Sequence, residues 1–315
     1  MRVLVTELIW PEGLAELEAF GEVEYDPDLW QKPEEVRAKA KAADAVVVRN
    51  QTRVDAPLFE SGVSLKAIGR LGVGLDNIDL EAARSRGVPV VYARNANAVS
   101  VAEYVIGAVL LASRNLSAAS EDVKSGGWDR KRFGGFEVYG KTLGLVGVGE
   151  ISRRVARRAS AFGMRVVSHD PYVAPYDYPA VELGIELLDL DAVVEQADFI
   201  SLHVPLTPGT QNLLSIDNFR KMKPDAWVIN TSRGGVVNEA DLASALDQGL
   251  IGGAVLDVLE SEPPQADNPL LAHERVVLTP HVAGLTEEAQ VNTSILVARE
   301  VTKVLRGQPS LCVVG

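Results

Sequence analysis

A glycine-rich turn in the middle of the chain has the residue types and spacing of a phosphate-binding loop. It follows a short apolar run, Thr142–Val146, that predicts a strand, and a helical pattern begins directly after it. The first glycine permits a tight turn, the second lets backbone approach a pyrophosphate, and the helix N-terminus then faces the negative charge. The third position is normally Gly or Ala, and the small residue Ser152 stands there. The residues predicted to bind a dinucleotide here are Gly147, Gly149, Glu150 and Ile151.

A carboxylate follows this turn at the distance expected for ribose binding. Asp170 lies 21 residues after Gly149, at the end of the next predicted strand. A carboxylate at that place accepts hydrogen bonds from the adenosine ribose. Residues 171–174 contain no Arg or Lys for a 2′-phosphate, and the carboxylate would repel that phosphate. We therefore predict NAD rather than NADP; the alternative is an ordinary strand–turn–helix with a solvated aspartate.

Polar side chains also follow each of four later predicted strands. Ligands of open α/β sheets bind outside the carboxyl ends of the strands, so these groups are candidates for a site. Scattered surface polarity would not fall so regularly. The four groups are His203–Thr210, Thr231–Gly235, Asp257–Glu262 and Thr279–Gly284.

Short apolar runs alternate with helical patterns along nearly the whole chain. Apolar runs without polar alternation suit parallel strands that are buried on both faces, and their alternation with helices predicts βαβ units. We expect two α/β units with parallel sheets of the Rossmann or flavodoxin type. The stretch Val101–Lys124 predicts one long helix, and Glu287–Leu305 predicts the last one. We place the boundaries so that residues 99–285 are inserted into a domain made of residues 1–98 and 286–315.

The composition of the 315 residues is that of an ordinary globular protein, with 47% hydrophobic and 23% charged residues. The formal net charge of −12 disfavours binding to nucleic acid or to an anionic membrane. The single cysteine, Cys312, excludes a disulfide within the chain and a cysteine-rich metal site, and we predict no metal. The N-terminus lacks a signal-peptide pattern, and no apolar run approaches the roughly 20 residues of a membrane span. We expect a cytoplasmic protein.

Several motifs occur together in one order along the chain. They are Gly72–Asp79, Ser100–Glu103, the glycine turn, Asn230–Gly235, Asp257–Pro263 and Thr279–Gly284. In these motifs the chain resembles the D-isomer-specific 2-hydroxyacid dehydrogenase family, which includes D-3-phosphoglycerate dehydrogenases, and the resemblance covers nearly the whole chain. It implies NAD-dependent hydride transfer between a D-2-hydroxy acid and its 2-keto acid. It also implies that residues 99–285 bind NAD and that the other domain binds the substrate.

The resemblance implies that Arg233, Glu262 and His281 are catalytic. The residue types suit the reaction, because histidine can exchange the proton of the alcohol, a neighbouring carboxylate can orient the ring, and a guanidinium can bind a carboxylate and polarise a carbonyl. Without this placement each of them would be read as a structural or solvated side chain. The further cofactor-binding residues that the resemblance implies are His203, Val204, Pro205, Thr210, Thr231, Ser232, Arg233, Asp257, His281, Ala283 and Gly284.

Two segments of the first domain are candidates for substrate binding. Around Val73 and Gly74 the backbone can offer N–H groups to a carboxylate, although a simple tight turn is the alternative. Arg49 and Asn50 begin a segment that resembles the place where phosphoglycerate dehydrogenases hold the distal phosphate. We therefore expect a small substrate with a second anionic group. The chain also resembles the (S)-sulfolactate dehydrogenase branch at three segments, Val5–Glu7, Val48–Thr52 and Arg70–Gly74. The predicted substrate-binding residues are Arg49, Asn50, Val73, Gly74, Arg233 and His281.

Assembly and rival functions follow from the same resemblance. The stretch Val101–Lys124 resembles the family's dimerisation helices and predicts a homodimer, unless it packs only against its own domain. The chain length predicts no additional C-terminal regulatory domain. The alternatives are a hydroxypyruvate or glyoxylate reductase and an NAD-sensing binding protein of the same fold. Formate dehydrogenases carry an extended N-terminus and further substrate residues that we do not find.

Overall fold

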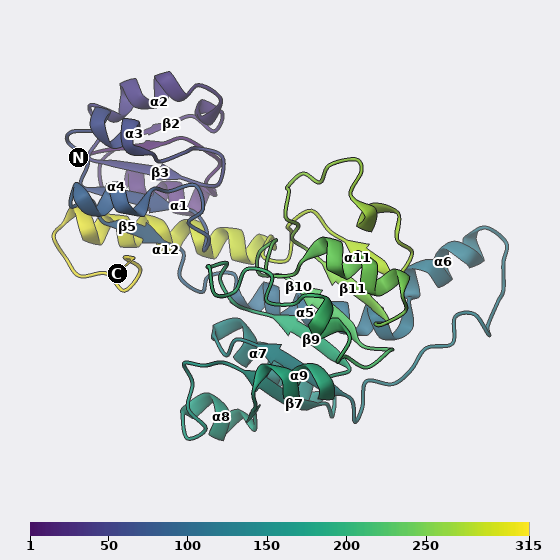
Figure 1. The fold of residues 1–315 in the computed structure, drawn as a ribbon. Coiled ribbons are helices and arrows are strands. Elements are labelled where there is room, and N and C mark those ends of the chain that lie inside the picture. Colours follow the sequence, from purple (N-terminus) through teal and green to yellow (C-terminus); the bar gives the residue numbers. More distant parts are fainter. Residues whose placement is uncertain (315) are drawn as a thin grey trace. The chain divides into compact units, whose positions relative to one another are not determined.

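The chain divides into two compact units, each built around one sheet (Figure 1). The computed structural model describes residues 1–314. Met1–Asn97 and Leu285–Gly315 form the five-stranded unit, and Ala98–Gly284 form the seven-stranded unit. The strands named within each sheet pair in parallel, so the predicted fold class is confirmed.

The sheet of the five-stranded unit has the order β2-β1-β3-β4-β5. The chain leaves β1 toward β2 on one side and then continues through β3 on the other, so the strand order reverses between β1 and β3. Such a switch point leaves a crevice at the carboxyl ends of the two strands. The strands are β1 (Arg2–Val5), β2 (Glu22–Tyr25), β3 (Ala45–Val48), β4 (Ala67–Arg70) and β5 (Val90–Tyr92).

Helices cover both faces of this sheet, which explains why its central strands are apolar at successive positions. One face, which includes Val3 and Val5, packs against α1 (Pro11–Glu18) and α12 (Glu287–Leu305). The opposite face, which includes Leu4, packs against three helices. These helices are α2 (Pro33–Ala40), α3 (Ala56–Ser61) and α4 (Leu80–Ser85).

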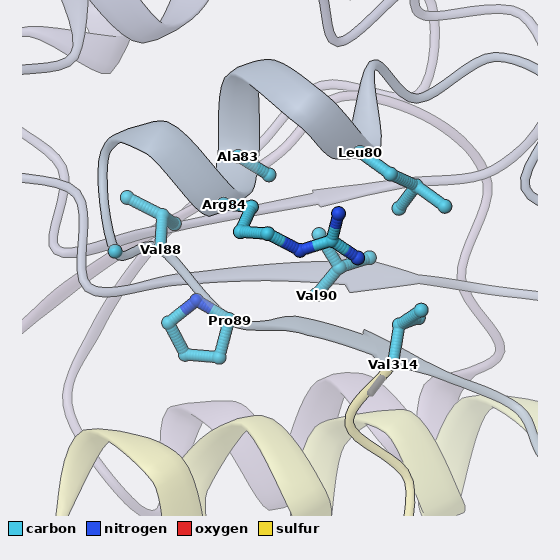
Figure 2. A pocket seen from close by; sticks show the side chains of 8 residues that line it. Leu80, Ala83, Arg84, Val88, Pro89, Val90 and Val314 are labelled. Atoms are coloured by element: carbon cyan, nitrogen blue, oxygen red, sulfur yellow. The ribbon is translucent and has the colours of Figure 1, made fainter.

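A hollow of about 240 Å³ opens beside β5 (Figure 2). The guanidinium of Arg84 extends from α4 across it toward Val90, and Val314 closes it from the C-terminal segment. That segment runs antiparallel to β5, where the N–H of Val314 donates to the carbonyl of Val90 at 2.9 Å. None of the predicted site residues lines this hollow.

The sheet of the seven-stranded unit has the order β12-β11-β10-β9-β6-β7-β8. The strand order reverses at β6, because the chain runs from β6 through β7 to β8 and then crosses to β9 on the other side. The switch point therefore lies between β6 and β9. The strands are β6 (Thr142–Val146), β7 (Arg165–His169), β8 (Glu186–Leu187), β9 (Phe199–Leu202), β10 (Trp227–Asn230), β11 (Gly253–Leu256) and β12 (Val276–Leu278).

This sheet is also covered on both faces. Helices α5 (Ala98–Arg114) and α7 (Glu150–Ala161) pack on one face. Helices α9 (Leu190–Gln196), α10 (Ile216–Phe219) and α11 (Glu239–Asp247) pack on the other. The short helix α8 (Tyr178–Leu183) packs beside α7.

The prediction of one helix over Val101–Lys124 is wrong. The helix ends at Arg114, and α6 (Leu116–Lys124) begins after Asn115, whose φ of 41° is left-handed. Asparagine tolerates this conformation better than other residues with a side chain. Within residues 1–314 no single helix is long and apolar enough to cross a membrane, and α5 with α6 reach that length only together, bent by 56°.

Candidate active site

The predicted site residues of the seven-stranded unit lie along one edge of its sheet. Val146, Leu202, Asn230, Leu256 and Leu278 end their strands in register with their neighbours. Neighbouring strands lie about 4.8 Å apart, so the residues that follow these positions form a continuous row. The row contains each of the four polar groups that the sequence places after strands.

The glycine turn after β6 has the shape of an anion cradle. Gly147 has a φ of 93°, and a Cβ atom there would lie 2.7 Å from the carbonyl oxygen of His203, so only glycine fits. At Gly149 a Cβ would meet no atom within 4 Å, so the space above this residue is open. Gly149 is also the N-cap of α7 and provides no side-chain cap, which leaves the first N–H groups of the helix available. Ser152 is fully buried, as the close packing at the third position of the motif requires.

Asp170 shapes this turn from the neighbouring strand. Its Oδ2 accepts a hydrogen bond from the N–H of Val148 at 2.8 Å, and its Oδ1 accepts one from Tyr172 at 2.9 Å. Each carboxylate oxygen retains a second acceptor position for a ribose hydroxyl. Asp170 thus joins the turn to the end of β7.

The loop after β9 begins with a neutral histidine. The Nε2 atom of His203 lies 2.9 Å from the hydroxyl of Ser201, and burial lowers the pKa of His203 to about 4. The ring is therefore uncharged at neutral pH. Val204 and Pro205 follow it, and the hydroxyl of Thr210 closes the loop by accepting the N–H of Thr207 at 2.8 Å.

Asn230 organises the turn that carries Arg233. Its side-chain oxygen accepts the N–H and the hydroxyl of Ser232 at 3.0 and 2.7 Å, and its amide nitrogen donates to the carbonyl of Arg233 at 2.9 Å. The buried Oγ1 of Thr231 has no hydrogen-bond partner within residues 1–314. An orphaned hydroxyl in this row fits a site for a polar ligand.

His281 and Glu262 form a hydrogen-bonded pair. Nδ1 of His281 lies 2.8 Å from Oε2 of Glu262, and the other oxygen, Oε1, accepts the N–H of Leu259 at 3.1 Å. The backbone bond fixes the orientation of the carboxylate, and the carboxylate then fixes the ring. Because Nδ1 faces an acceptor, it carries a proton, and Nε2 is left to exchange a proton with a substrate. Both side chains remain substantially exposed, His281 at 49% and Glu262 at 41%.

Asp257 holds the turn that presents His281. Its side chain is 1% exposed and accepts three hydrogen bonds: from the hydroxyl of Thr279 at 2.6 Å and from the N–H groups of Val282 and Ala283 at 2.8 Å each. The hydroxyl of Tyr104, on α5, extends this network to Thr279 at 2.6 Å. The backbone of His281 itself is left-handed, with a φ of 54°, which the surrounding bonds must maintain.

The turns that carry Arg233 and Glu262 lie against each other. A Cβ atom at Gly234 would lie 1.9 Å from the carbonyl oxygen of Leu259, so the absence of a side chain at Gly234 permits this close approach. The row therefore combines a guanidinium, a carboxylate–imidazole pair and an anion cradle. Such an arrangement can bind a dinucleotide and exchange a proton with an alcohol or a carbonyl.

The predicted substrate residues of the five-stranded unit follow the neighbouring strands β3 and β4. The N–H groups of Val73 and Gly74 donate to no acceptor within residues 1–314, so they are open to a ligand. Gly72 has a φ of 156°, which residues with a side chain rarely adopt, and this explains the glycine there. Arg49 donates through Nη2 to Oε1 of Gln290 at 2.9 Å, and the side chain of Asn50 is exposed.

A comparison with protein families decides the relationship of this chain. Residues 106–283, more than half of the chain, match the model of the D-isomer specific 2-hydroxyacid dehydrogenase, NAD binding domain. The chain belongs to this dehydrogenase family. The resemblance stated from the sequence is therefore confirmed.

Individual relatives support the same assignment. The D-3-phosphoglycerate dehydrogenase of Methanocaldococcus jannaschii is 46% identical over 309 residues, which are 98% of this chain and 58% of that protein. Two solved structures match this chain over the full length of both chains. The TT0316 protein of Thermus thermophilus has 33% identity and a TM-score of 0.90. A D-lactate dehydrogenase of Escherichia coli has 30% identity and a TM-score of 0.84. The chain spans between half and three fifths of the length of the curated dehydrogenases that it matches.

Two residues that support candidate site residues of their own unit were not predicted as site residues from the sequence. In the seven-stranded unit, Tyr104 bonds to Thr279 and so extends the hydrogen-bond network of Asp257. In the five-stranded unit, Glu7 binds the loop after β3. Glu7 had a usable signal, because it is an acidic residue in an otherwise apolar segment directly after a predicted strand. Tyr104 had none, since its partner lies 175 positions away in the sequence.

Proposed function

We propose that this protein is an NAD-dependent oxidoreductase that transfers a hydride between a D-2-hydroxy acid and its 2-keto acid. The observation that carries the proposal is the His281–Glu262 pair at 2.8 Å, on the same sheet edge as the glycine cradle. In this proposal the seven-stranded unit binds NAD and the five-stranded unit binds the substrate.

The cofactor proposal rests on the fit of the cradle. Nicotinamide, when bound, accepts or supplies the hydride at its C4 atom. The open space at Gly149 and the uncapped start of α7 suit the pyrophosphate, and Asp170 suits the ribose. We favour NAD over NADP because Asp170 would repel a 2′-phosphate and residues 171–174 supply no cation. The proposed contacts include Gly147, Glu150, Ile151, His203, Val204, Pro205, Thr210, Thr231, Ser232, Arg233, Asp257, His281, Ala283 and Gly284.

The proton chemistry is assigned to His281. Its Nε2 removes the hydroxyl proton during oxidation and returns it to the developing alkoxide during reduction. Glu262 holds the ring in the tautomer that makes this possible and stabilises the charged imidazolium. Arg233 binds the substrate carboxylate and polarises the carbonyl, a role that suits its planar fork of donors.

The substrate is proposed to be a small 2-hydroxy acid with a second anionic group. The open N–H groups of Val73 and Gly74 would bind the carboxylate. Burial lowers the pKa of the Arg49 guanidinium, and the charge of the Glu7 carboxylate acts in the opposite direction. Within residues 1–314 the Arg49 guanidinium forms no salt bridge within 4.0 Å. A partly buried cation that lacks a salt bridge favours an anionic ligand. The names of the relatives support a phosphate as this anion, and the segments that resemble sulfolactate dehydrogenases support a sulfonate.

The deciding experiment measures NADH consumption with a panel of 2-keto acids, with NADPH in parallel. The panel contains 3-phosphohydroxypyruvate, sulfopyruvate, hydroxypyruvate, glyoxylate and pyruvate. We expect turnover with NADH and the highest kcat/KM for an acid with two anionic groups. Turnover restricted to glyoxylate and hydroxypyruvate would support the reductase alternative. Tight NADH binding without any turnover would support the NAD-sensing alternative instead.

We also propose that the protein is a cytoplasmic homodimer that binds neither nucleic acid nor membrane. Helix α6 has no buried residue, and its Leu116 and Val123 are exposed, as is Trp128 at 77% in the following loop. A second copy of the chain would cover these apolar side chains. Analytical ultracentrifugation of the wild type and of a Val123→Asp/Trp128→Ser variant tests this, since only the wild type should sediment as a dimer.

A further inference from the structure

The crevice at the switch point of the five-stranded sheet is occupied by a side chain of the protein itself. Glu7 lies two residues after β1, and residues 49–52 directly follow β3. These are the two strands between which the strand order reverses. In open α/β sheets this is the place where a ligand binds. Here a carboxylate that is only 3% exposed fills it.

The Glu7 carboxylate accepts hydrogen bonds from four consecutive backbone N–H groups. Oε1 accepts those of Arg49 at 2.8 Å and Thr52 at 2.9 Å, and Oε2 accepts those of Asn50 at 3.1 Å and Gln51 at 2.9 Å. Converging N–H groups of this kind form a concave anion site. The site is therefore already filled by an internal anion, and no N–H of this loop is left for a ligand.

The first and last residues of the loop form further hydrogen bonds. Nδ2 of Asn77 donates to the carbonyl of Thr52 at 2.7 Å and to that of Arg49 at 3.3 Å. The hydroxyl of Thr52 lies 2.8 Å from that of Thr6, below the loop. The loop is thus held through its four N–H groups and at both ends, which leaves the side chains of Arg49 and Asn50 to contact a ligand.

The Arg49 side chain makes its direct contacts with neutral groups, and the Glu7 carboxylate acts on its charge without a salt bridge. Its guanidinium lies 5.7 Å from the centre of the Trp10 ring and 2.9 Å from the side-chain oxygen of Gln290. Neither contact neutralises the positive charge. By contrast, the next loop along the same sheet edge keeps its backbone N–H groups at Val73 and Gly74 open. The two loops therefore offer two different kinds of anion recognition, one through a side chain and one through the backbone.

We infer that Glu7 is a positioning residue for substrate selection: its carboxylate occupies the backbone anion site of residues 49–52 and fixes Arg49, whose side chain then recognises the second anionic group of the substrate. The inference rests on the proposed function and names the part of the chain that would distinguish substrates with two anionic groups from those with one. Glu7 itself contacts neither substrate nor cofactor in this scheme.

The test compares Glu7→Gln and Glu7→Asp with the wild type. Glutamine keeps the size of the side chain, but its amide nitrogen cannot accept, so two of the four N–H groups lose their acceptor. We expect KM for the preferred doubly anionic keto acid to rise about tenfold or more, with kcat within about threefold of the wild-type value. KM for glyoxylate, which has a single anionic group, should change less than about twofold. Aspartate keeps the charge and should recover part of the loss.

The sign of the KM change is informative. Loss of the Glu7 charge alone would strengthen the field of Arg49 and lower KM, whereas loss of loop geometry raises it. An unchanged or lower KM for the doubly anionic acid would therefore overturn the inference, as would equal KM increases for both classes of substrate. The matched control is Glu300→Gln, because Glu300 is also a buried glutamate of the five-stranded unit, paired on α12 with Lys303. It should leave both KM values unchanged.

A second measurement does not depend on activity. Amide hydrogen exchange of residues 49–52 should accelerate at least about tenfold in Glu7→Gln, while exchange in β4 stays unchanged. Wild-type exchange rates in that variant would overturn the inference even in a protein without measurable turnover. A wild-type protein that turned over no keto acid would instead overturn the proposed function, so the two failures can be told apart.

Discussion

Replacement of Glu262 by glutamine should disable the proposed proton exchange without disturbing the fold. The carboxylate makes two bonds, one from the N–H of Leu259 to Oε1 at 3.1 Å and one between Oε2 and Nδ1 of His281 at 2.8 Å. A glutamine has one accepting oxygen, which the Leu259 N–H would take. The amide NH2 would then face Nδ1 and make it an acceptor, so the proton of a neutral ring would move to Nε2. An Nε2 that already carries a proton cannot accept one from an alcohol.

The size of the effect follows from the bonds that change. A hydrogen bond to a charged partner contributes about 1.5–3 kcal/mol, or roughly a 10- to 150-fold effect, and the wrong tautomer adds to this. We expect kcat/KM to fall about 100- to 1,000-fold, by the same factor for oxidation and reduction, because an enzyme cannot change the equilibrium constant. Steady-state kinetics in both directions measure this, with NADH affinity followed by fluorescence and expected to stay within about twofold.

A matched control is Glu274→Gln, which changes an exposed glutamate of the same unit. It should retain wild-type kinetics. A loss smaller than about fivefold in Glu262→Gln would refute the assignment of Glu262 as the residue that orients His281, since even one lost charged hydrogen bond should exceed it.

Three further predictions concern the cofactor cradle, the partly buried His203 and the turn that presents His281. Gly149→Ala should weaken NADH binding about tenfold or more at unchanged thermal stability, since the added Cβ meets no protein atom. Gly147→Ala should instead destabilise the fold, because the φ of Gly147 is 93° and the added Cβ would collide with His203. Calorimetry and NADH titration distinguish the two variants, and unchanged NADH affinity in Gly149→Ala would contradict the proposed cradle. The pKa of His203 is about 4 in the folded protein and about 6.5 in the unfolded chain, so between these values only the unfolded chain binds the proton. The free energy of unfolding should therefore decrease by about 2 kcal/mol between pH 8 and pH 5. Urea unfolding measures this decrease, which should be largely absent in His203→Gln. Asp257→Asn removes one of the two oxygens that accept bonds from three donors, which should lower the free energy of unfolding by about 2–3 kcal/mol and kcat by about 100-fold. Tyr104→Phe leaves those three bonds intact and should lower the free energy of unfolding by less than about 1 kcal/mol. A larger effect of Tyr104→Phe would show that Asp257 does not hold the turn.

The fold was largely predictable because its strands are short apolar runs. The predicted strand 142–146 coincides with β6 and the predicted helix 287–305 with α12, as the structure bounds them. The break at Asn115 was not predicted, because one residue with a left-handed backbone interrupts a helix whose apolar pattern continues. Periodicity reports which face of a segment is apolar, and it is insensitive to a local change in φ.

The candidate site was predictable in part for a similar reason. Groups such as Asp170 and His281 follow strands, and the carboxyl ends of parallel strands bring them to one edge. What the sequence could not indicate were the partners that hold them. Asp170 binds the N–H of Val148, and Glu7 binds four N–H groups more than 40 positions away. Such bonds depend on the register of neighbouring strands, which spacing along the chain does not encode.

The return of α12 to the first sheet has a consequence for synthesis of the chain. The seven-stranded unit is complete once Gly284 has been made, whereas one face of the five-stranded sheet still lacks its cover. Val297 and Val301 fill that face, and Gly69 on β4 leaves the space for them, since a Cβ there would lie 2.8 Å from Val301. During synthesis, the strands of the N-terminal sheet therefore keep an exposed apolar face until residues 287–305 have emerged from the ribosome. The seven-stranded unit is therefore synthesised later but can finish folding first. The strands of the five-stranded unit are the part of the nascent chain most in need of protection from aggregation.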